Sequence, residues 1–177
     1  MKAIVLDAIG GPENLQVKEV ITPTPSAGEV RIKLQTSALN RRDYWMTKGQ
    51  YPGMKLPCIT GSDGAGVVDM AGKGVDPKLV GQEVVIYPAR SWGDNQHYYG
   101  GEFRVLGMPD QGTFAEYICV PSTDVAPKPQ HLSWEEAAAV PLAGLTAWRA
   151  AITHAEVKAG DKVLITGAGS GVSTVAI

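Results

Sequence analysis

The sequence predicts an α+β, mostly β protein, in which a β domain is followed by helices and by the start of an α/β unit. Short apolar runs rich in β-branched residues recur between residues 2 and 120, and the 21 glycines and 12 prolines favour short strands joined by tight turns. After Ser133 the pattern changes to strong helix formers. We therefore predict two regions, 1–130 and 131–177, with one full core and part of a second.

Strands in the first region are predicted from alternating or continuously apolar runs, of which Val30-Arg-Ile-Lys-Leu34 is the clearest. Turns rich in glycine and proline separate these runs. The runs cover residues 2–7, 15–21, 29–38, 61–68, 83–88 and 114–120, and a short helix is expected within 39–50. Strands spaced so closely predict a small barrel or a twisted sandwich.

A long stretch without a clear strand or helix pattern, Ala89 to Gly112, separates the last two runs. It carries Trp92, Tyr98, Tyr99 and Phe103 among polar residues and glycines. A loop of this length is usually functional or packed on itself. We favour an ordered surface lobe whose aromatic side chains fill their own small core, and the alternative is a substrate lid or a subunit contact.

Two helices are predicted in the second region. Ser133-Trp-Glu-Glu136 is a capping box, in which the serine accepts a free N–H of the first turn and the glutamate bonds back to the serine. Pro141 breaks or kinks this helix, and Gly144 to Ile152 resumes helical spacing. The helices lead to a turn at Lys158-Ala-Gly-Asp161.

The last residues have the pattern of a nucleotide-binding turn. Lys162-Val-Leu-Ile-Thr166 predicts a buried strand, Gly167-Ala-Gly-Ser-Gly171 a glycine turn, and Val172 to Ile177 the beginning of a helix. Glycines allow the backbone to approach a pyrophosphate, and the free N–H groups at a helix start meet its charge. Gly167, Gly169, Gly171 and Val172 are therefore candidate dinucleotide-binding residues.

One residue departs from the dinucleotide pattern, because Ser173 stands where a third glycine would allow close packing of helix and strand. The alternative interpretation of the whole segment is a glycine turn of an α/β unit that binds no ligand.

Composition argues against several classes of partner. The formal net charge is −2, from 16 basic and 18 acidic residues mixed along the chain, so no basic surface for nucleic acid or anionic membrane is expected. No apolar run approaches the roughly 18 residues of a membrane span, and Met1 to Asp7 does not resemble a signal peptide. The two cysteines, Cys58 and Cys119, are too few for a disulfide framework, which favours a reducing, cytoplasmic location.

Three segments taken together resemble a known family. They are Leu39-Asn-Arg-Arg-Asp43, Gly61-Ser-Asp-Gly-Ala-Gly-Val-Val68 and Val140-Pro-Leu-Ala-Gly-Leu-Thr-Ala147, followed by the glycine turn. Their order and spacing resemble the medium-chain dehydrogenase/reductase superfamily over essentially the whole chain, closest to its zinc-less quinone-oxidoreductase-like branch and the related zinc-type alcohol dehydrogenases.

The resemblance implies a fold and an extent. It implies a GroES-like β-barrel domain followed by helices and the first strand, turn and helix start of a Rossmann α/β domain, with the active site in the cleft between the two domains. Members are roughly twice as long, so the chain is expected to be truncated after the first strand and turn of the nucleotide domain.

The resemblance also implies that zinc is absent. In zinc-dependent relatives the catalytic ligands fall where this chain has Asn40, Ser62 and Leu142, and an amide, a hydroxyl and an alkyl group do not replace thiolates and imidazole. The structural-zinc lobe of those relatives falls near 89–112, which contains no cysteine. His97, His131 and His154 lie on separate segments and are interpreted as solvated or core residues.

The candidate site residues follow from the resemblance. Asn40 is implied as a catalytic hydrogen-bond donor, Thr146 as a catalytic residue that also contacts the nicotinamide, and Trp45 as a cofactor-side aromatic lining the cleft. From the residues alone, Asn40 can instead cap the following helix, Thr146 can bond back to a helix carbonyl, and Trp45 can belong to the core.

Charged residues beside these segments have structural interpretations first. Asp43 and Asp63 are acid candidates, but Asp43 is expected to fix the local backbone or pair with a cation. Arg41 and Arg42 are adjacent and do not share a helix face, so one is expected to meet solvent, phosphate or substrate and the other a structural carboxylate.

The sequence thus indicates an NAD(P)-dependent, zinc-independent oxidoreductase acting on a small-molecule quinone, enone or carbonyl/alcohol substrate, present as an N-terminal part with weak or no cofactor binding of its own. The alternative is a catalytically silent truncated GroES-like domain that acts as a binding or oligomerisation module. A homodimer that buries the apolar start of the nucleotide domain is a possible assembly.

Overall fold

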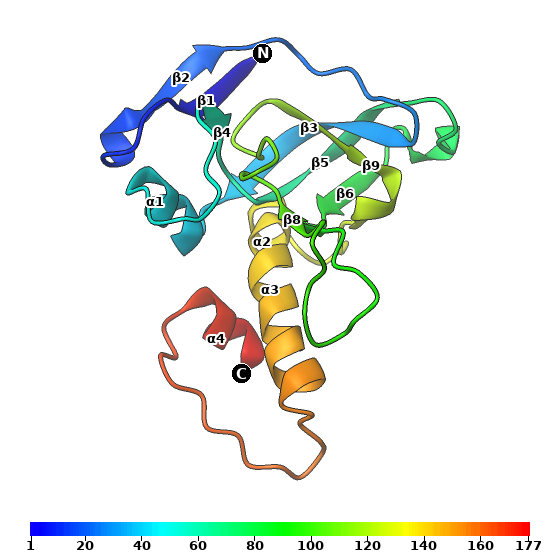
Figure 1. The fold of residues 1–177 in the computed structure, drawn as a ribbon. Coiled ribbons are helices and arrows are strands. Elements are labelled where there is room, and N and C mark those ends of the chain that lie inside the picture. The colour runs from blue at the N-terminus through cyan, green and yellow to red at the C-terminus, as the bar shows by residue number, and fades with distance from the viewer.

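The computed structural model describes residues 1–177, which form a β-rich body and a helical arm (Figure 1). All strand pairs are antiparallel. The strands are β1 (Lys2–Leu6), β2 (Leu15–Glu19), β3 (Glu29–Ala38), β4 (Cys58–Ile59), β5 (Asp63–Ala71), β6 (Glu83–Ile86), β7 (Ala89–Arg90), β8 (Arg104–Val105), β9 (Tyr117–Pro121) and β10 (Val125–Pro127). Single 3₁₀ turns lie at Pro12–Asn14, Pro77–Leu79 and Ser122–Asp124.

The main sheet has five strands in the order β10-β6-β5-β3-β9. Strand β3 is its longest member, and it pairs with β5 along most of its length and with β9 from Glu29 to Lys33. The alternating run Val30 to Leu34 sends Val30 and Ile32 into the core, as the period of two requires. The buried side chains of this core are Val30, Ile32, Val68, Val84, Ile86, Leu106, Ile118 and Val120.

A smaller sheet, β2-β1-β4, covers one side of the body together with helix α1 (Arg41–Thr47). Its core joins Leu6 of β1 to Met46 of α1, with Cys58 and Met108 beside them. The two sheets are linked where Ala3 bridges Ala115. The strands and the short helix predicted from the apolar runs are therefore confirmed, with ends shifted by a few residues.

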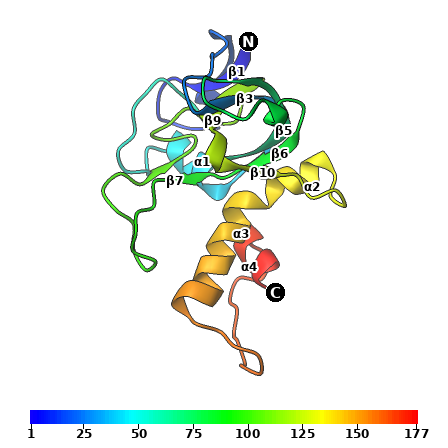
Figure 2. The same cartoon turned by 90° about the vertical axis from the view of Figure 1, so that its right-hand side faces the viewer.

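The helical arm projects away from the sheets (Figures 1 and 2). Helix α2 (Trp134–Ala139) begins with the predicted capping box, in which Ser133 Oγ accepts from the Glu136 N–H and Glu136 Oε2 accepts from the Ser133 N–H. Its Ala137 and Ala138 pack on Ala65 of β5, which fixes the arm to the main sheet.

The second part of the arm is helix α3 (Pro141–Trp148), which continues as a π-helical turn, η4 (Arg149–His154). Pro141 has no N–H to give to the preceding turn and stands at the first position of α3, so the predicted break at this proline is confirmed. The boundary near residue 130 stays a prediction, and the chain passes there from β10 to α2 without a regular element.

The lobe formed by residues 89–112 packs on itself, as the favoured interpretation predicted. The rings of Trp92, Tyr99 and Phe103 contact one another with centroids 4.8–5.8 Å apart, but Tyr99 is exposed like Tyr98, so the cluster lies at the surface of the lobe. The lobe also touches the arm, because the Arg149 guanidinium lies 3.6 Å from the centre of the Trp92 ring.

The segment predicted as a buried strand, 162–166, is the clearest error of the sequence interpretation. It pairs with no other strand, and Leu164 is 89% exposed. A parallel strand exists through hydrogen bonds to neighbouring strands, and no other segment of the chain lies beside this one. The glycine turn and helix start are confirmed, since α4 (Gly171–Ala176) follows and Ser170 Oγ accepts from the Ser173 N–H.

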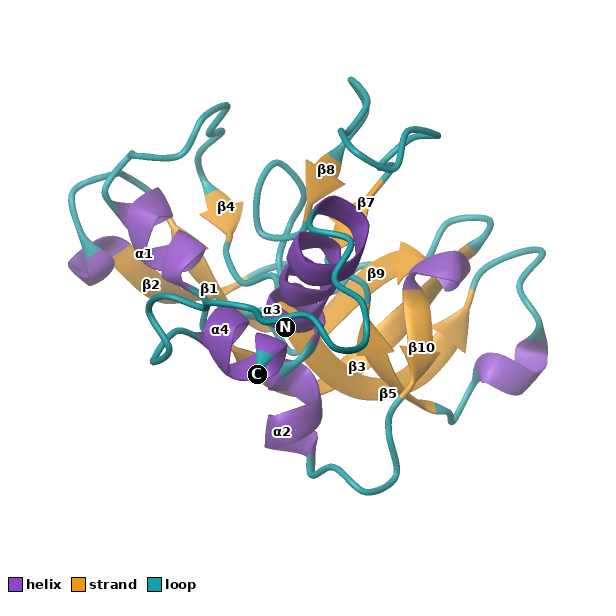
Figure 3. Ribbon diagram, turned by 90° about the horizontal axis from the view of Figure 1, so that it is seen from below, coloured by secondary structure: helices purple, strands orange, loops and turns teal.

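Helix α4 packs against α3, on the side of the arm opposite to the lobe (Figures 1 and 3). A Cβ placed on Gly144 would lie 3.8 Å from Val175, and one placed on Gly171 would lie 3.8 Å from Ala143. Apolar residues within the chain therefore hold α4, while the segment before it crosses solvent. No helix of the structure is long and apolar enough to span a bilayer.

Candidate functional site

A buried aspartate joins the β body to the helical arm. Asp63, at the start of β5, has no solvent exposure. Its Oδ2 accepts a hydrogen bond of 2.9 Å from Asn40 Nδ2, and its Oδ1 accepts one of 2.8 Å from the backbone N–H of Leu142. Each of the three segments that carry the family resemblance therefore contributes a group to one junction.

Local sequence explains why both donors are available. Pro141 opens α3, so the N–H of Leu142 is an early helix donor without a partner inside its own helix. Asn40 precedes α1, and its backbone N–H donates to Asp43 Oδ2 at 2.7 Å. Asp43 thus fixes the local backbone as predicted. Asn40 is the N-cap of α1, as the alternative interpretation predicted, and its Nδ2 also reaches Asp63.

Burial governs the electrostatics of the junction. It raises the pKa of Asp63 to about 6, although the hydrogen bonds from Asn40 and Leu142 and the positive charge of Arg42 act in the opposite direction. Burial also raises the pKa of Asp43, whose Oδ1 has no hydrogen-bond partner. Two neighbouring carboxyl groups with raised pKa values are typical of functional sites, although structural networks show them too.

Arg42 corrects one prediction. It forms no ion pair with a carboxylate, and instead donates to the carbonyls of Leu106 and Met108, to Ser62 Oγ and to Tyr51 Oη. The physical reason is that Asp43 is already committed to the backbone of Asn40, while the loop at 106–108 offers carbonyls that need donors. The other arginine, Arg41, is exposed.

A cavity of about 330 Å³ lies between the lobe and the arm. Leu142 is both a member of the junction and part of this cavity's wall. Thr146 also lines it, and its Oγ1 donates to the Leu142 carbonyl at 2.7 Å, which is the back-bonded alternative considered from the sequence. Trp92 and Phe103 of the lobe close the other side.

Trp45 lies outside that cavity. It sits on α1, is partly exposed rather than in the core, and its ring meets the Tyr44 ring edge-on with centroids 5.1 Å apart. The structure therefore places Asn40 in the junction and Thr146 one hydrogen bond beyond it, through Leu142, but Asn40 does not line the cavity, and Trp45 and the glycine turn belong to neither.

The glycine turn leaves room for a ligand. Gly167 has a φ of 69°, which favours glycine, and nothing lies within 4 Å of a Cβ placed on Gly167 or Gly169. Ser173, at the position of the missing third glycine, is buried, and its Oγ donates to the Thr166 carbonyl. The backbone of this turn fits the approach of a pyrophosphate.

The residues at the expected zinc-ligand positions do not fit zinc. The positions expected for ligands hold Asn40, Ser62 and Leu142, and Ser62 Oγ donates to the Leu106 carbonyl at 2.8 Å. No group of three or more His, Cys, Asp or Glu side chains is placed to hold a metal ion. His97 and His154 approach each other, with ring centroids 5.9 Å apart, but no acidic or thiol group completes a ligand set with them.

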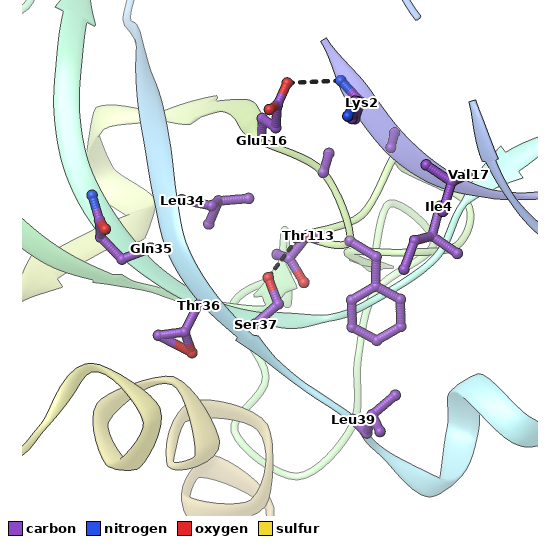
Figure 4. A pocket seen from close by; sticks show the side chains of 13 residues that line it. Lys2, Ile4, Val17, Leu34, Gln35, Thr36, Ser37, Leu39, Thr113 and Glu116 are labelled. Atoms are coloured by element: carbon purple, nitrogen blue, oxygen red, sulfur yellow. Dashed lines mark hydrogen bonds between the residues drawn. The ribbon is translucent and has the colours of Figure 1, made fainter. Parts of the chain in front are cut away.

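Two larger cavities are not lined by Asn40, Asp63 or Leu142. One of about 440 Å³ runs between β1 and β3, where Ser37 Oγ donates to the Thr113 carbonyl and Glu116 accepts from the Lys2 N–H (Figure 4). The other, of about 500 Å³, is lined by both cysteines, and burial raises the pKa of the Cys119 thiol to about 11. Neither contains a candidate residue named from the sequence.

The sequence did not predict the role of Asp63 as the junction. A signal was present, because a proline at the first position of α3 leaves the next N–H free and a carboxylate is a suitable acceptor. The missing information was the long-range contact, since Asp63 and Leu142 are 79 residues apart.

Comparison with known proteins agrees with this fold. Residues 26–130 match the alcohol dehydrogenase GroES-like domain family. The chain is 36% identical to a zinc-type alcohol dehydrogenase-like protein of Schizosaccharomyces pombe, over 100% of this chain and 52% of that protein. The predicted fold class is confirmed, and the chain belongs to the alcohol dehydrogenase GroES-like family of the medium-chain dehydrogenases/reductases.

Solved structures give the same result. An NAD-dependent alcohol dehydrogenase superposes with a TM-score of 0.92 at 44% identity, over 99% of this chain and 53% of that one. The quinone oxidoreductase of Coxiella burnetii superposes with a TM-score of 0.82 at 32% identity, over 100% of this chain and 52% of that one. The chain spans about half the length of the relatives it matches.

Proposed function

We propose that this chain is the catalytic-domain part of an NAD(P)-dependent, zinc-independent oxidoreductase that acts on a quinone, an enone or a carbonyl/alcohol substrate. The observation that supports it most directly is the junction at Asp63, which connects Asn40 to α3 beside a cavity lined by Thr146. These are the two residues that the family pattern implies for catalysis.

The residues have distinct parts in this proposal. When bound, a nicotinamide supplies or accepts the hydride. Asn40 is half-buried, one of its N–H groups is held by Asp63, and its other N–H is available to bond a substrate oxygen on which charge develops. Thr146, Trp92 and Phe103 form the walls that exclude water and hold an apolar substrate.

The cofactor side is assigned to Gly167, Gly169, Gly171 and Val172 for the pyrophosphate, and to Thr146 and Trp45 for the nicotinamide. The open turn at Gly167 and Gly169 supports the first assignment. A cytoplasmic location is part of the proposal, because two cysteines are too few for a disulfide framework.

Zinc independence is proposed from the donor set. An amide, a hydroxyl and an alkyl group stand at the three expected ligand positions, and the buried Asp63 has both oxygens occupied by N–H donors. Elemental analysis of the purified protein is expected to find no stoichiometric zinc, and one zinc per chain that survives dialysis against a chelator would refute the assignment.

A second function has its own support. The exposed apolar residues Leu164, Val175 and Ile177 favour a binding or oligomerisation module in which two chains bury this surface, without catalysis. The two functions differ in what they need, since catalysis needs the junction and the turn, whereas assembly needs only the exposed apolar side chains.

Calorimetric titration with NADH and with NADPH tests the proposal. Because the turn provides contacts for the pyrophosphate alone, we expect this chain to bind no better than roughly millimolar, about 4 kcal/mol. Micromolar binding that Gly169→Ala abolishes would show a complete cofactor site within the chain. In an active form of the protein, Asn40→Ala is expected to lower turnover on the order of 100-fold, and to cost about 1–3 kcal/mol in stability.

A further inference from the structure

One hydrogen-bonded path joins the two proposed catalytic residues. Asn40 Nδ2 donates to Asp63 Oδ2, the Leu142 N–H donates to Asp63 Oδ1, and Thr146 Oγ1 donates to the Leu142 carbonyl. All three distances lie between 2.7 and 2.9 Å. Asp63 is the side chain through which this path passes from the β body to the arm.

Asp63 Oδ2 determines the orientation of the Asn40 side-chain amide. An ionised carboxylate only accepts hydrogen bonds, so the nitrogen end of the amide must face it. Were the amide reversed, two oxygen atoms would face each other inside the protein without a proton between them. Asp63 therefore leaves one N–H of Asn40 to offer, while the Oδ1 of Asn40 faces the first turn of α1, where Asn40 is the N-cap.

Asp63 Oδ1 fixes the start of α3. Leu142 is the first residue of α3 with an N–H, and Thr146 follows one turn later. Because Thr146 is bonded back to the carbonyl of Leu142, a change in the position of Leu142 moves Thr146 with it.

Stability alone does not explain a carboxylate at this position. Burial without a cation in direct contact penalises the charge of Asp63, as its pKa of about 6 indicates. A neutral asparagine has the same shape and no cost of charge burial, but it satisfies both neighbours only if the Asn40 amide reverses. What it cannot do is accept with both ends, and this is the property that fixes Asn40.

We propose that Asp63 is a positioning residue, which orients the Asn40 amide toward the substrate and sets the position of Thr146 relative to it. The inference rests on the proposed function and adds to it a residue that touches neither substrate nor cofactor. Asp63 acts as an acceptor-only group at the point where body and arm meet.

The test is Asp63→Asn, with Asp69→Asn as the matched control. Asp69 lies on the same strand and pairs with Arg31 at 2.8 Å, away from Asn40 and α3. In Asp63→Asn the new amide has one acceptor end and one donor end. We expect its oxygen to keep the Leu142 N–H and its nitrogen to face Asn40, so the Asn40 amide must reverse.

Nuclear magnetic resonance of this chain can detect the reversal of the Asn40 amide, and it needs neither bound cofactor nor an activity assay. We expect the Asn40 side-chain amide signals to shift in Asp63→Asn and to stay in place in Asp69→Asn, while the Leu142 N–H remains protected from exchange in both. Unchanged Asn40 signals in Asp63→Asn would overturn the proposal, since the amide would then not depend on Asp63.

Kinetics then measure what the orientation does. In an active form of the protein, Asp63→Asn is expected to lower kcat about 100-fold with KM little changed, and Asp69→Asn to lower neither. A reversed amide with full kcat would also overturn the positioning role. If even the unaltered protein has no activity, the proposed function fails, and the resonance data still decide whether Asp63 orients Asn40.

Discussion

The junction at Asp63 and the segment 155–177 differ in how much of their structure the chain itself supports. At the junction, a carboxylate without solvent exposure has both oxygens bonded by groups from two distant segments. In 155–177, Ser173 is the single buried residue, and the stretch 162–166 has no strand partner. One region is fixed by contacts on all sides, and the other is held mainly by α4 against α3.

This difference shows that the junction is preorganised by the fold, whereas the glycine turn is not. The groups that would orient a substrate are held by the β body, whereas the turn that would hold a cofactor keeps its local shape without a sheet around it. The geometry of the junction is therefore expected to survive changes in 155–177. Changes in the body are expected to disrupt both the junction and the turn. Matched substitutions in the two regions test this directly.

The largest effect is expected from a pair of glycines. A Cβ on Gly66, in β5, would lie 2.3 Å from the Lys33 carbonyl oxygen, so Gly66→Ala must move the central strands apart and should cost about 3 kcal/mol or more. Gly169→Ala meets nothing within 4 Å and should change stability by less than about 0.5 kcal/mol. Urea denaturation measures both, and equal losses would contradict the comparison.

A pair of leucines should give the next largest effect. Leu6 has no exposure and lies in the core between β1 and α1, so Leu6→Ala is expected to cost about 2–5 kcal/mol. Leu164 is 89% exposed, and Leu164→Ala should cost nothing measurable. A clear loss of stability in Leu164→Ala would mean that 162–166 is buried in solution, as it would be in the proposed dimer, and sedimentation at several concentrations would then detect that dimer.

Much of the body was predictable from the sequence because its signals are local. Alternation in Val30 to Leu34, the capping box at Ser133 and the break at Pro141 each depend on neighbours within a few residues. The predicted strand at 162–166 was wrong for the opposite reason. Its apolar pattern is genuine, but a strand needs partners, and pattern alone does not say whether partners exist.

The candidate site was predictable only in part. The family pattern named Asn40 and Thr146, and the structure connects both to Asp63. The sequence did not reveal Asp63 as the link, because that contact depends on how the arm packs on the sheet. Nor did it reveal that Arg42 bonds carbonyls of a loop more than sixty residues away.

The pH dependence of stability should report Asp63 itself. Its pKa is raised from 3.8 to about 6, so the folded state binds a proton more tightly than the unfolded state does. The free energy of unfolding should therefore fall as pH rises from about 4 to 6, by up to about 3 kcal/mol from this group. Asp63→Asn removes that contribution, while the raised pKa of Asp43 remains in both proteins. The difference between their urea midpoints across this range isolates Asp63, and a pH-independent difference would contradict its raised pKa.

The smallest effect, and the finest test of the comparison, comes from two serines in the same role. Ser133 Oγ and Ser170 Oγ each accept a hydrogen bond of 3.2 Å from the N–H three residues on, at the starts of α2 and α4. Ser133→Ala is expected to cost about 1 kcal/mol and to lower the melting temperature by roughly 2–4 °C, because α2 is packed on the main sheet and unfolds with it. Ser170→Ala should leave the melting temperature unchanged and speed hydrogen exchange within 171–177 alone, because α4 can open while the body stays folded. If Ser170→Ala lowers the melting temperature as much as Ser133→Ala does, the contacts between α4 and α3 make 155–177 part of the same cooperative unit. The turn would then be preorganised together with the junction.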